Sequence, residues 1–227
     1  MSSLIRNLSF TASTLALLAC SEAVLEAPKT GISPNTESAL EIKYEKFTLD
    51  NGLDVIFHID RSDPVVAIDL AAHVGSGREV PGRTGFAHLF EHLLFLDSEN
   101  LGYGGLDEMN TRIGGDGTNG FTTNDMTQYF QAVPKDALEK IIWAEADKLG
   151  WFINTVSQDV VDNEKQVVKN EKRQRVDNQP YGHNLYIVSK ALYPEGHPYN
   201  WQVIGSLADL DAATLQGLPH QGLQESL

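Results

Sequence analysis

The hydrophobic pattern becomes regular only after a long, irregular N-terminal stretch. Two segments rich in β-branched and aromatic residues, 43–49 (KYEKFTL) and 53–59 (LDVIFHI), flank the pair Asn51-Gly52. Because Asn-Gly tolerates the positive φ angles of a tight turn, the two segments predict a β-hairpin. A third segment, 64–74, is mostly apolar and ends at glycines, which predicts a buried strand.

The pattern then becomes helical. Residues 86–96 (FAHLFEHLLFL) are apolar nearly all round a helix, which predicts that this helix is buried. Apolar residues at regular spacing predict further elements: helices over 106–113, 135–149, 157–178 and 183–192, and a strand over 127–133. The helical spacing over 135–149 places Trp143 and Leu149 in the core. Together these elements predict an α+β fold, with an antiparallel sheet and helices packed on one of its faces.

The N-terminus has the layout of a secretion signal. Residues 1–19 carry one basic residue, Arg6, and no acidic residue, and they include an apolar run. The run is about a dozen residues long, too short to cross a bilayer as a helix. Cys20, the single cysteine, follows Leu-Leu-Ala, which resembles the lipobox of bacterial lipoproteins. We therefore expect a signal peptide over 1–19 and lipidation of Cys20, the alternative being that Cys20 is only a small residue of the signal.

This N-terminus also predicts a location. In bacterial lipoproteins of this kind, Ser21 rather than Asp after the cysteine implies sorting to the outer membrane, with the folded part in the periplasm of a Gram-negative-type cell. Residues 20–40 are rich in Ser, Thr, Pro, Gly and Glu without periodicity, which predicts a flexible tether. We therefore expect contact with the membrane only through the lipid.

Composition and charge narrow the classes of partner. The chain is 41% hydrophobic and 21% charged, an ordinary globular composition that excludes a fibrous or wholly disordered protein. Seventeen basic and 31 acidic residues give a formal net charge of −14, which repels nucleic acid phosphates and anionic lipid surfaces. We therefore expect no nucleic acid partner, and we infer no substrate from charge alone.

Three ionisable residues stand inside the predicted buried helix. Burying polar groups without partners costs on the order of several kcal/mol each, and a metal ion would satisfy them. His88 and His92 are one helical turn apart, so both imidazoles can converge on a single ion. Glu91 lies on the same face but is displaced around it, where it can act on a metal-bound water as a general base without being a ligand.

A catalytic zinc site needs a third protein ligand and one open position for water. Glu164 and Glu171 are seven residues apart in the predicted helix 157–178, so two turns bring them to one face. One glutamate can bind the ion while the other hydrogen-bonds a ligand or assists proton transfer. The alternative is a pair of solvated surface glutamates. The same donors would also accept other divalent metals.

The order of these residues resembles a known family. HxxEH, residues 88–92, inverts the HExxH motif and resembles the inverzincin metallopeptidases of the pitrilysin or insulinase family, which include the mitochondrial processing peptidases. The family also has an E-x6-E pair farther along the chain, as Glu164 and Glu171 are here. Other segments from about 43 to 215 resemble family motifs: LDNGL at 49–53, VGSGRE at 74–79, the glycines before the helix from Gly82, NGFTTNDMTQYF at 119–130 and PYNWQVIG at 198–205.

The resemblance implies a function and assigns roles. It places Zn²⁺ on His88, His92 and Glu171, makes Glu91 the general base and gives Glu164 a supporting catalytic role. The family binds an extended peptide by adding it to the edge of a strand, which here corresponds to Asn119, Gly120, Phe121 and Thr122. The expected function is therefore a zinc metalloendopeptidase acting on peptides or unfolded proteins.

The chain departs from the family in one consequential way. Enzymes of this kind enclose the substrate between two similar halves, and only one half is found here. We expect the metallopeptidase domain over 41–215, and we interpret 216–227, which no longer resembles the family, as an atypical tail left by truncation. Two alternatives stay open: a catalytically incompetent half that binds zinc and peptide and needs a separate partner chain, and a zinc hydrolase that does not act on peptides.

The remaining histidines are expected to lie outside the metal site. His58 and His73 are placed on the predicted strands as ordinary strand residues. His183, His197 and His220 are expected to be surface or loop residues.

Overall fold

The computed structural model describes residues 41–217. All the described helices and strands lie in one compact unit, which begins at Lys43. The predicted signal peptide, the tether to residue 40, Cys20 and His220 lie outside the described residues. Among the residues described, no helix is both long enough and apolar enough to cross a membrane.

The central sheet has three antiparallel strands in the order β3-β5-β4. They are β3 (Val65–Ala72), β4 (Asn119–Thr122) and β5 (Thr127–Pro134). Side chains alternate along β5: Tyr129 and Val133 are buried, whereas Phe130 is exposed on the opposite face. One face of the sheet is therefore covered, as the predicted α+β fold requires.

The predicted hairpin forms a separate two-stranded sheet, β1 (Glu45–Thr48) with β2 (Asp54–Phe57). Gly52 in its turn has a φ of +89°, the conformation that the Asn-Gly pair predicts. Placing His58 and His73 on strands was wrong by one residue, because each follows the last residue of its strand.

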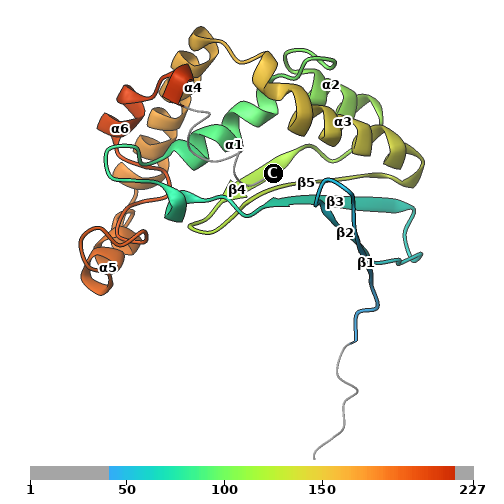
Figure 1. Cartoon of the computed structure of the whole chain (residues 1–227), viewed down its shortest axis with the longest axis horizontal. Helices are drawn as coiled ribbons and strands as arrows, with labels where there is room; N and C mark the ends of the chain where they lie inside the picture. The colour runs from blue at the N-terminus through green and yellow to red at the C-terminus, as the bar shows by residue number, and fades with distance from the viewer. Residues whose placement is uncertain (1–40, 218–227) are drawn as a thin grey trace, which may run out of the picture. The chain divides into compact units, whose positions relative to one another are not determined.

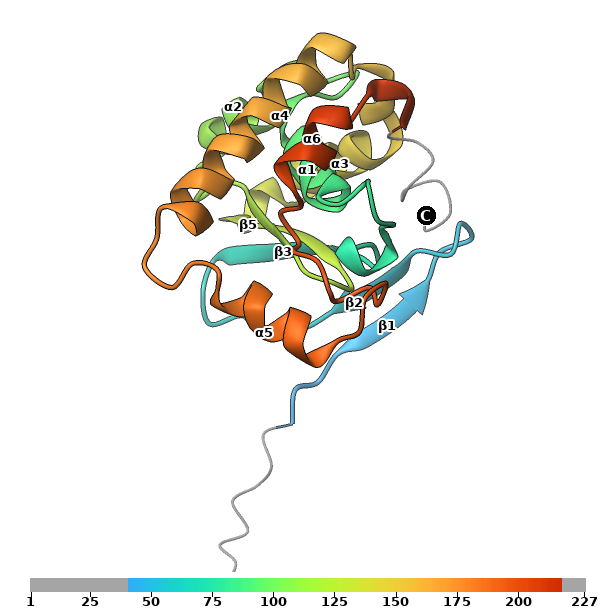
Figure 2. The ribbon, with the colours of Figure 1, turned by 90° about the vertical axis from the view of Figure 1, so that its left-hand side faces the viewer.

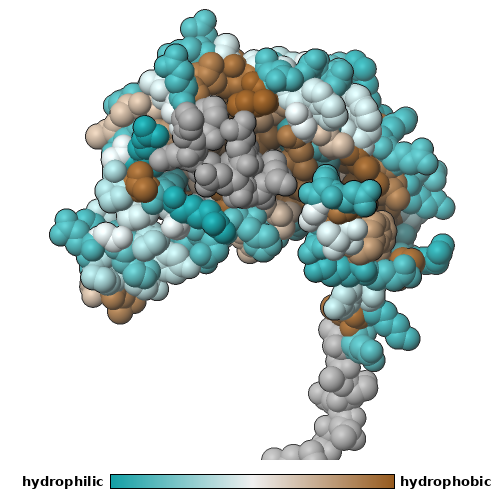
Figure 3. Space-filling view, viewed as in Figure 1, coloured by the Kyte–Doolittle hydropathy of each residue, from teal (hydrophilic) through white to brown (hydrophobic). Residues whose placement is uncertain are grey.

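The helices lie on one side of the sheet (Figures 1 and 2). They are α1 (Phe86–Leu96), α2 (Gly105–Arg112), α3 (Leu138–Trp151), α4 (Gln158–Lys172) and α6 (Leu207–Ala212). Short 3₁₀ turns cover Ser76–Arg78, Lys135–Ala137, Phe152–Asn154 and Leu215–Gly217, and a π-helical turn, Arg173–Asp177, follows α4. Helix α5 (Asn184–Leu192) buries none of its residues, and Figure 3 shows hydrophobic side chains on its exposed end.

The main core surrounds α1, which is buried as the sequence predicts. Leu89 and Leu93 of α1 pack with Val161 and Val168 of α4 and with Leu210 of α6. A second cluster joins α2, α3 and β5: Leu106, Val133, Ala137, Ile141 and Ala144. The first cluster fixes α1 against α4, the two helices that carry the predicted metal ligands.

The prediction that Trp143 lies in the core is wrong. Trp143 is 49% exposed and Leu149 is only half-buried, whereas Ile141, Ala144 and Lys148 form the buried side of α3. The helix is apolar on several sides, so its spacing alone does not identify the face that packs on β5.

A buried carboxylate anchors the N-terminus of α1. Glu79 accepts backbone N–H groups from Gly85 at 3.0 Å and Ala87 at 2.8 Å, which satisfies two donors that a helix start leaves unpaired. Gly85 has a φ of +88°, and a Cβ there would lie 2.7 Å from the carbonyl oxygen of Ile204. The end of α1 is thus fixed by both a carboxylate and a close backbone contact.

This anchor predicts a pH-dependent stability. Burial raises the pKa of Glu79 to about 7 from its ordinary 4.5, although the two N–H groups oppose the shift. A raised carboxyl pKa stabilises the folded state fully below about pH 4.5, and that contribution is lost as the pH rises through about 7. We expect this loss to reach up to ~3 kcal/mol of unfolding free energy.

Urea unfolding of the full chain and of Glu79→Gln between pH 4.5 and 8 measures this contribution. The difference between the two proteins should change across the range, because the variant cannot titrate at this position. The exposed control Glu139→Gln should show a constant difference. A constant difference for Glu79→Gln as well would contradict the prediction.

Candidate metal centre

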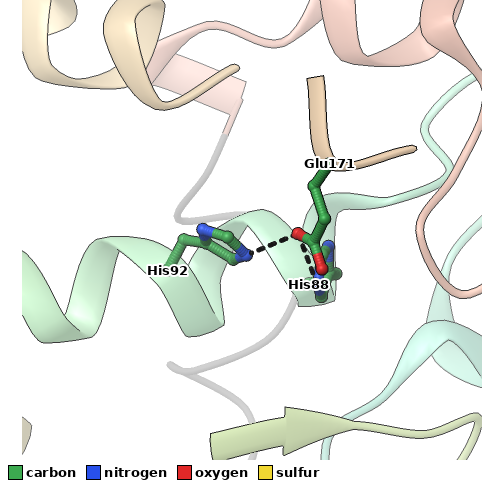
Figure 4. A group of neighbouring side chains, drawn as sticks. All are labelled: His88, His92 and Glu171. Atoms are coloured by element: carbon green, nitrogen blue, oxygen red, sulfur yellow. Dashed lines mark ion pairs between the residues drawn. The ribbon is translucent and has the colours of Figure 1, made fainter. Parts of the chain in front are cut away.

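Three donor atoms from two helices converge on one point (Figure 4). His88 and His92 project from α1, and Glu171 reaches them from α4. Glu171 Oε2 lies 3.2 Å from His92 Nε2 and 3.7 Å from His88 Nε2. The spacing of one helical turn brings the two imidazoles together, and the packing of α4 on α1 brings the carboxylate to them.

These donors fit a metal ion. An ion bound tetrahedrally at ~2.0 to 2.1 Å from each donor would hold the donors ~3.3 Å apart, close to the separations seen. Glu171 Oε2 is buried and has no hydrogen-bond partner among the described residues, although it lies near both imidazoles. Coordination would satisfy this oxygen. Two imidazoles and one carboxylate also leave a tetrahedral position open for water.

Two further side chains orient the donors from outside. Glu164 Oε1 lies 2.8 Å from His92 Nδ1, so this buried carboxylate can accept the N–H that a coordinated imidazole still carries. Arg175, in the π-helical turn, places Nη1 2.8 Å from Glu171 Oε1. Sequence reasoning found Glu164 but missed Arg175, although its position four residues after Glu171 was a usable signal.

The two imidazoles titrate very differently in the absence of a metal. Burial alone would lower the pKa of His92, but the hydrogen bond with Glu164 and the nearby carboxylate of Glu171 raise it to about 9. Burial, together with the positive charge of His92, lowers the pKa of His88 to about 4. The neighbouring imidazole of His92, 3.2 Å away, lowers the pKa of Glu171. His92 therefore carries a second ring proton at neutral pH, and a metal ion bound to Nε2 would displace it.

Glu91 is buried beside this group. Its Oε2 accepts the hydroxyl of Thr122 at 2.5 Å. Burial raises the pKa of Glu91, and the hydrogen bond from Thr122 opposes the shift. The carboxyl group is thus held by one oxygen, and among the described residues the other oxygen makes no hydrogen bond. Sequence reasoning assigned Thr122 to substrate binding and did not predict this contact.

The four residues predicted to bind substrate form β4, an edge of the central sheet. Within the described part of the chain β4 pairs only with β5, and the N–H of Gly120 is donated to Asn119 Oδ1 at 2.9 Å. A Cβ on Gly120 would lie 3.0 Å from the ring of Phe95, so the strand passes close to α1. The edge strand β4 and the helix α1 that carries the two histidines are therefore neighbours, joined by the hydrogen bond from Thr122 to Glu91.

The comparisons with known proteins identify the family of this chain. Residues 55–197 match the family model described as insulinase (peptidase family M16). The chain belongs to this family. The protein named zinc protease PqqE from Helicobacter pylori is 34% identical over 189 residues, which cover 83% of this chain and 41% of that protein. This M16 chain thus spans about two fifths of that relative's length.

Other M16 relatives show the same partial coverage. The uncharacterized zinc protease YmxG of Bacillus subtilis is 27% identical over 180 residues, 78% of this chain and 42% of that protein. The crystal structure of a protease from Helicobacter pylori superimposes with a TM-score of 0.72 at 35% identity and covers 78% of this chain and 42% of that one. The predicted family and the α+β fold are both confirmed.

The other described histidines lie outside the metal group of this M16 chain. His183 is exposed, with Nε2 3.5 Å from Asp177 Oδ1. His197 is half-buried and accepts the backbone N–H of Tyr199 at 3.0 Å. His58 is exposed and lies 2.8 Å from the carbonyl oxygen of Lys43.

Proposed function

We propose that this chain is the zinc-binding part of a metalloendopeptidase that hydrolyses peptide bonds in extended peptides. The observation that carries the proposal is the convergence of His88, His92 and Glu171 beside the buried carboxyl of Glu91. Relatives that are named zinc proteases support zinc as the resident ion. When bound, zinc supplies Lewis acidity, which acidifies water and polarises a carbonyl group.

The chain's own residues then have distinct tasks. Glu91 takes the proton of the attacking water and passes it to the leaving amine, as its burial and raised pKa favour. Thr122 holds one oxygen of Glu91, so the other oxygen is directed to this transfer. Glu164 accepts a hydrogen bond from Nδ1–H of His92, which fixes the ring so that Nε2 would face the ion.

The substrate is an extended peptide bound to the edge of the sheet. An extended segment can pair with the edge of β4 that no described strand occupies, through main-chain hydrogen bonds and with little discrimination between sequences. The side chain of Thr122 joins this edge to Glu91, so the binding strand and the general base are held in one register.

We further propose that another M16-type half, on a separate chain, completes the chamber. The chain spans 41% of its Helicobacter pylori relative. Apolar side chains of the hairpin and α5 are also exposed, among them Phe47, Ile56, Leu185 and Leu192 (Figure 3). A chain that binds zinc and peptide but turns over only with its partner is the second candidate.

The proposed location is the periplasm, with lipid on Cys20 as the anchor.

Peptide hydrolysis by the full chain tests the proposal. We expect zinc-loaded protein to cleave an unstructured reporter peptide, 1,10-phenanthroline to stop cleavage, and added zinc to restore it. Glu91→Gln should keep about one zinc per chain and lose about 10²- to 10⁴-fold in rate, because the proton acceptor is gone. Mass spectrometry of the products and of the metal measures both quantities.

The control is Glu108→Gln, an exposed glutamate on α2, which should change neither zinc content nor rate. A parent chain that binds zinc but does not hydrolyse the peptide would support the second candidate function, a half that needs its partner. Adding a partner half should then restore turnover. A parent chain that binds no zinc would contradict the proposed metal centre.

A further inference from the structure

The two oxygens of Glu171 have different partners. Oε2 faces the imidazoles of His88 and His92, whereas Oε1 lies 2.8 Å from Nη1 of Arg175. The carboxylate side chain is only 16% exposed, so its orientation is confined. The contact between Arg175 and Glu171 is an ion pair, so the attraction of opposite charges favours a position in which Oε1 faces the guanidinium. Oε1 is therefore already engaged on the side away from the metal donors.

We propose that Arg175 is a positioning residue that makes Glu171 a single-oxygen ligand. This inference rests on the proposed metalloendopeptidase function. A carboxylate can bind a metal through one or both oxygens. With Oε1 held by Arg175, only Oε2 is available to the ion, and the fourth position stays open for water. Arg175 thus protects the open position that hydrolysis needs, without touching the substrate or the ion.

The backbone after α4 supports this role. Helix α4 ends at Lys172, and the next five residues, Arg173–Asp177, form a π-helical turn closed by the N–H of Asn178 on the carbonyl oxygen of Arg173 at 2.8 Å. Such turns are rare and occur often at functional sites. This one begins two residues after Glu171 and carries Arg175 back over its carboxylate.

The charges at the site agree with a positioning role. Three carboxylates, those of Glu91, Glu164 and Glu171, gather around the imidazoles. Arg175 offsets one of the three negative charges and leaves two for a divalent ion. Its side chain is 77% exposed, so solvent screens its charge and the pair adds little to folding stability. Its main effect should therefore be geometric and appear in metal binding.

Zinc affinity of the full chain, measured by competition with a chromophoric chelator, tests the inference. We expect Arg175→Met to weaken zinc binding by about 10- to 100-fold, as loss of a partner that orients a ligand does. Arg175→Lys keeps a positive charge but loses the planar guanidinium, so its zinc affinity should lie between those of the parent and of Arg175→Met. The matched control is Arg173→Met in the same turn, which pairs with Asn170 and should bind zinc as the parent does.

Visible absorption of the Co²⁺-substituted chain reports the geometry directly. The parent should give the intense absorption of four-coordinate cobalt, and Arg175→Met should lose intensity as the second oxygen of Glu171 enters. Unchanged affinity and spectrum in Arg175→Met, or equal losses in Arg173→Met, would overturn the inference while the proposed function stands. A parent that binds neither metal would overturn both.

Discussion

Replacing Glu171 with alanine should reduce bound zinc from about one ion per chain to nearly none after dialysis at neutral pH. Among the residues that the structure describes, Glu171 is the one carboxylate whose oxygen lies beside both imidazoles, at 3.2 Å from His92 and 3.7 Å from His88. Without it only two protein donors remain, fewer than a catalytic zinc site uses. The loss should exceed the ~10- to 100-fold expected when only a partner of a ligand is removed.

Glu164→Ala is the informative comparison. Glu164 contacts Nδ1 of His92 on the side away from the metal donors, so its loss should weaken zinc binding but still allow loading in excess zinc. The exposed control Glu139→Ala should bind as the parent does. Elemental mass spectrometry on the full-length proteins measures all three. Zinc retained in Glu171→Ala and lost in Glu164→Ala would reverse the assignment of the two glutamates.

Much of this centre could be predicted because it depends on local spacing. The four-residue step from His88 to His92 fixes both imidazoles on one face of any helix, and the seven-residue step from Glu164 to Glu171 does the same on α4. Spacing could not tell which glutamate faces the ion. The family resemblance implied Glu171, and the structure places that residue beside both histidines.

The contacts that spacing could not supply depend on tertiary packing or on irregular backbone. Thr122 reaches Glu91 across 31 positions, and that bond depends on how β4 packs against α1. Glu79 caps α1 only because the intervening loop turns back on itself. The four-residue spacing of Glu171 and Arg175 makes an ion pair possible, but the π-helical turn that carries Arg175 is not signalled by the hydrophobic pattern. The exposed Trp143 shows the same limit, because the packing of α3 is tertiary.

The polar network beneath β5 was not predicted either. Lys148 of α3 is 2% exposed, and its Nζ lies 2.7 Å from Glu145 Oε2 and 4.3 Å from the ring centre of Tyr129. Gln131 donates to the other oxygen of Glu145 at 2.8 Å. Burial lowers the pKa of Lys148, and the charge of Glu145 opposes the shift. Glu145 thus stabilises the buried ammonium group of Lys148, which the surrounding apolar side chains could not do.

Breaking this pair should be among the most destabilising changes in the fold. We expect Glu145→Ala to lower the free energy of unfolding by about 3 to 5 kcal/mol, because it leaves a buried ammonium without its partner. The double variant Glu145→Gln/Lys148→Met should be close to the parent, because it removes both charges and fills the same space. Urea unfolding of the full chain at pH 7 measures each value.

Glu108→Ala is the matched control, because it breaks an ion pair with Arg112 that is exposed on both sides, and its stability should hardly change. The sign of the buried effect can be checked with pH. Without Glu145 only burial acts on Lys148, so its pKa should fall further, and the deficit of Glu145→Ala should shrink as the pH rises and the neutral amine is favoured. If the double variant is as unstable as Glu145→Ala, the loss of unfolding free energy comes from the changed shape of the side chains rather than from an unpaired charge. Lys148 lies over the ring of Tyr129 in β5, and Tyr129 pairs with Gly120 of β4. In that case the packing of α3 on β5 would support the strand that is proposed to bind the substrate.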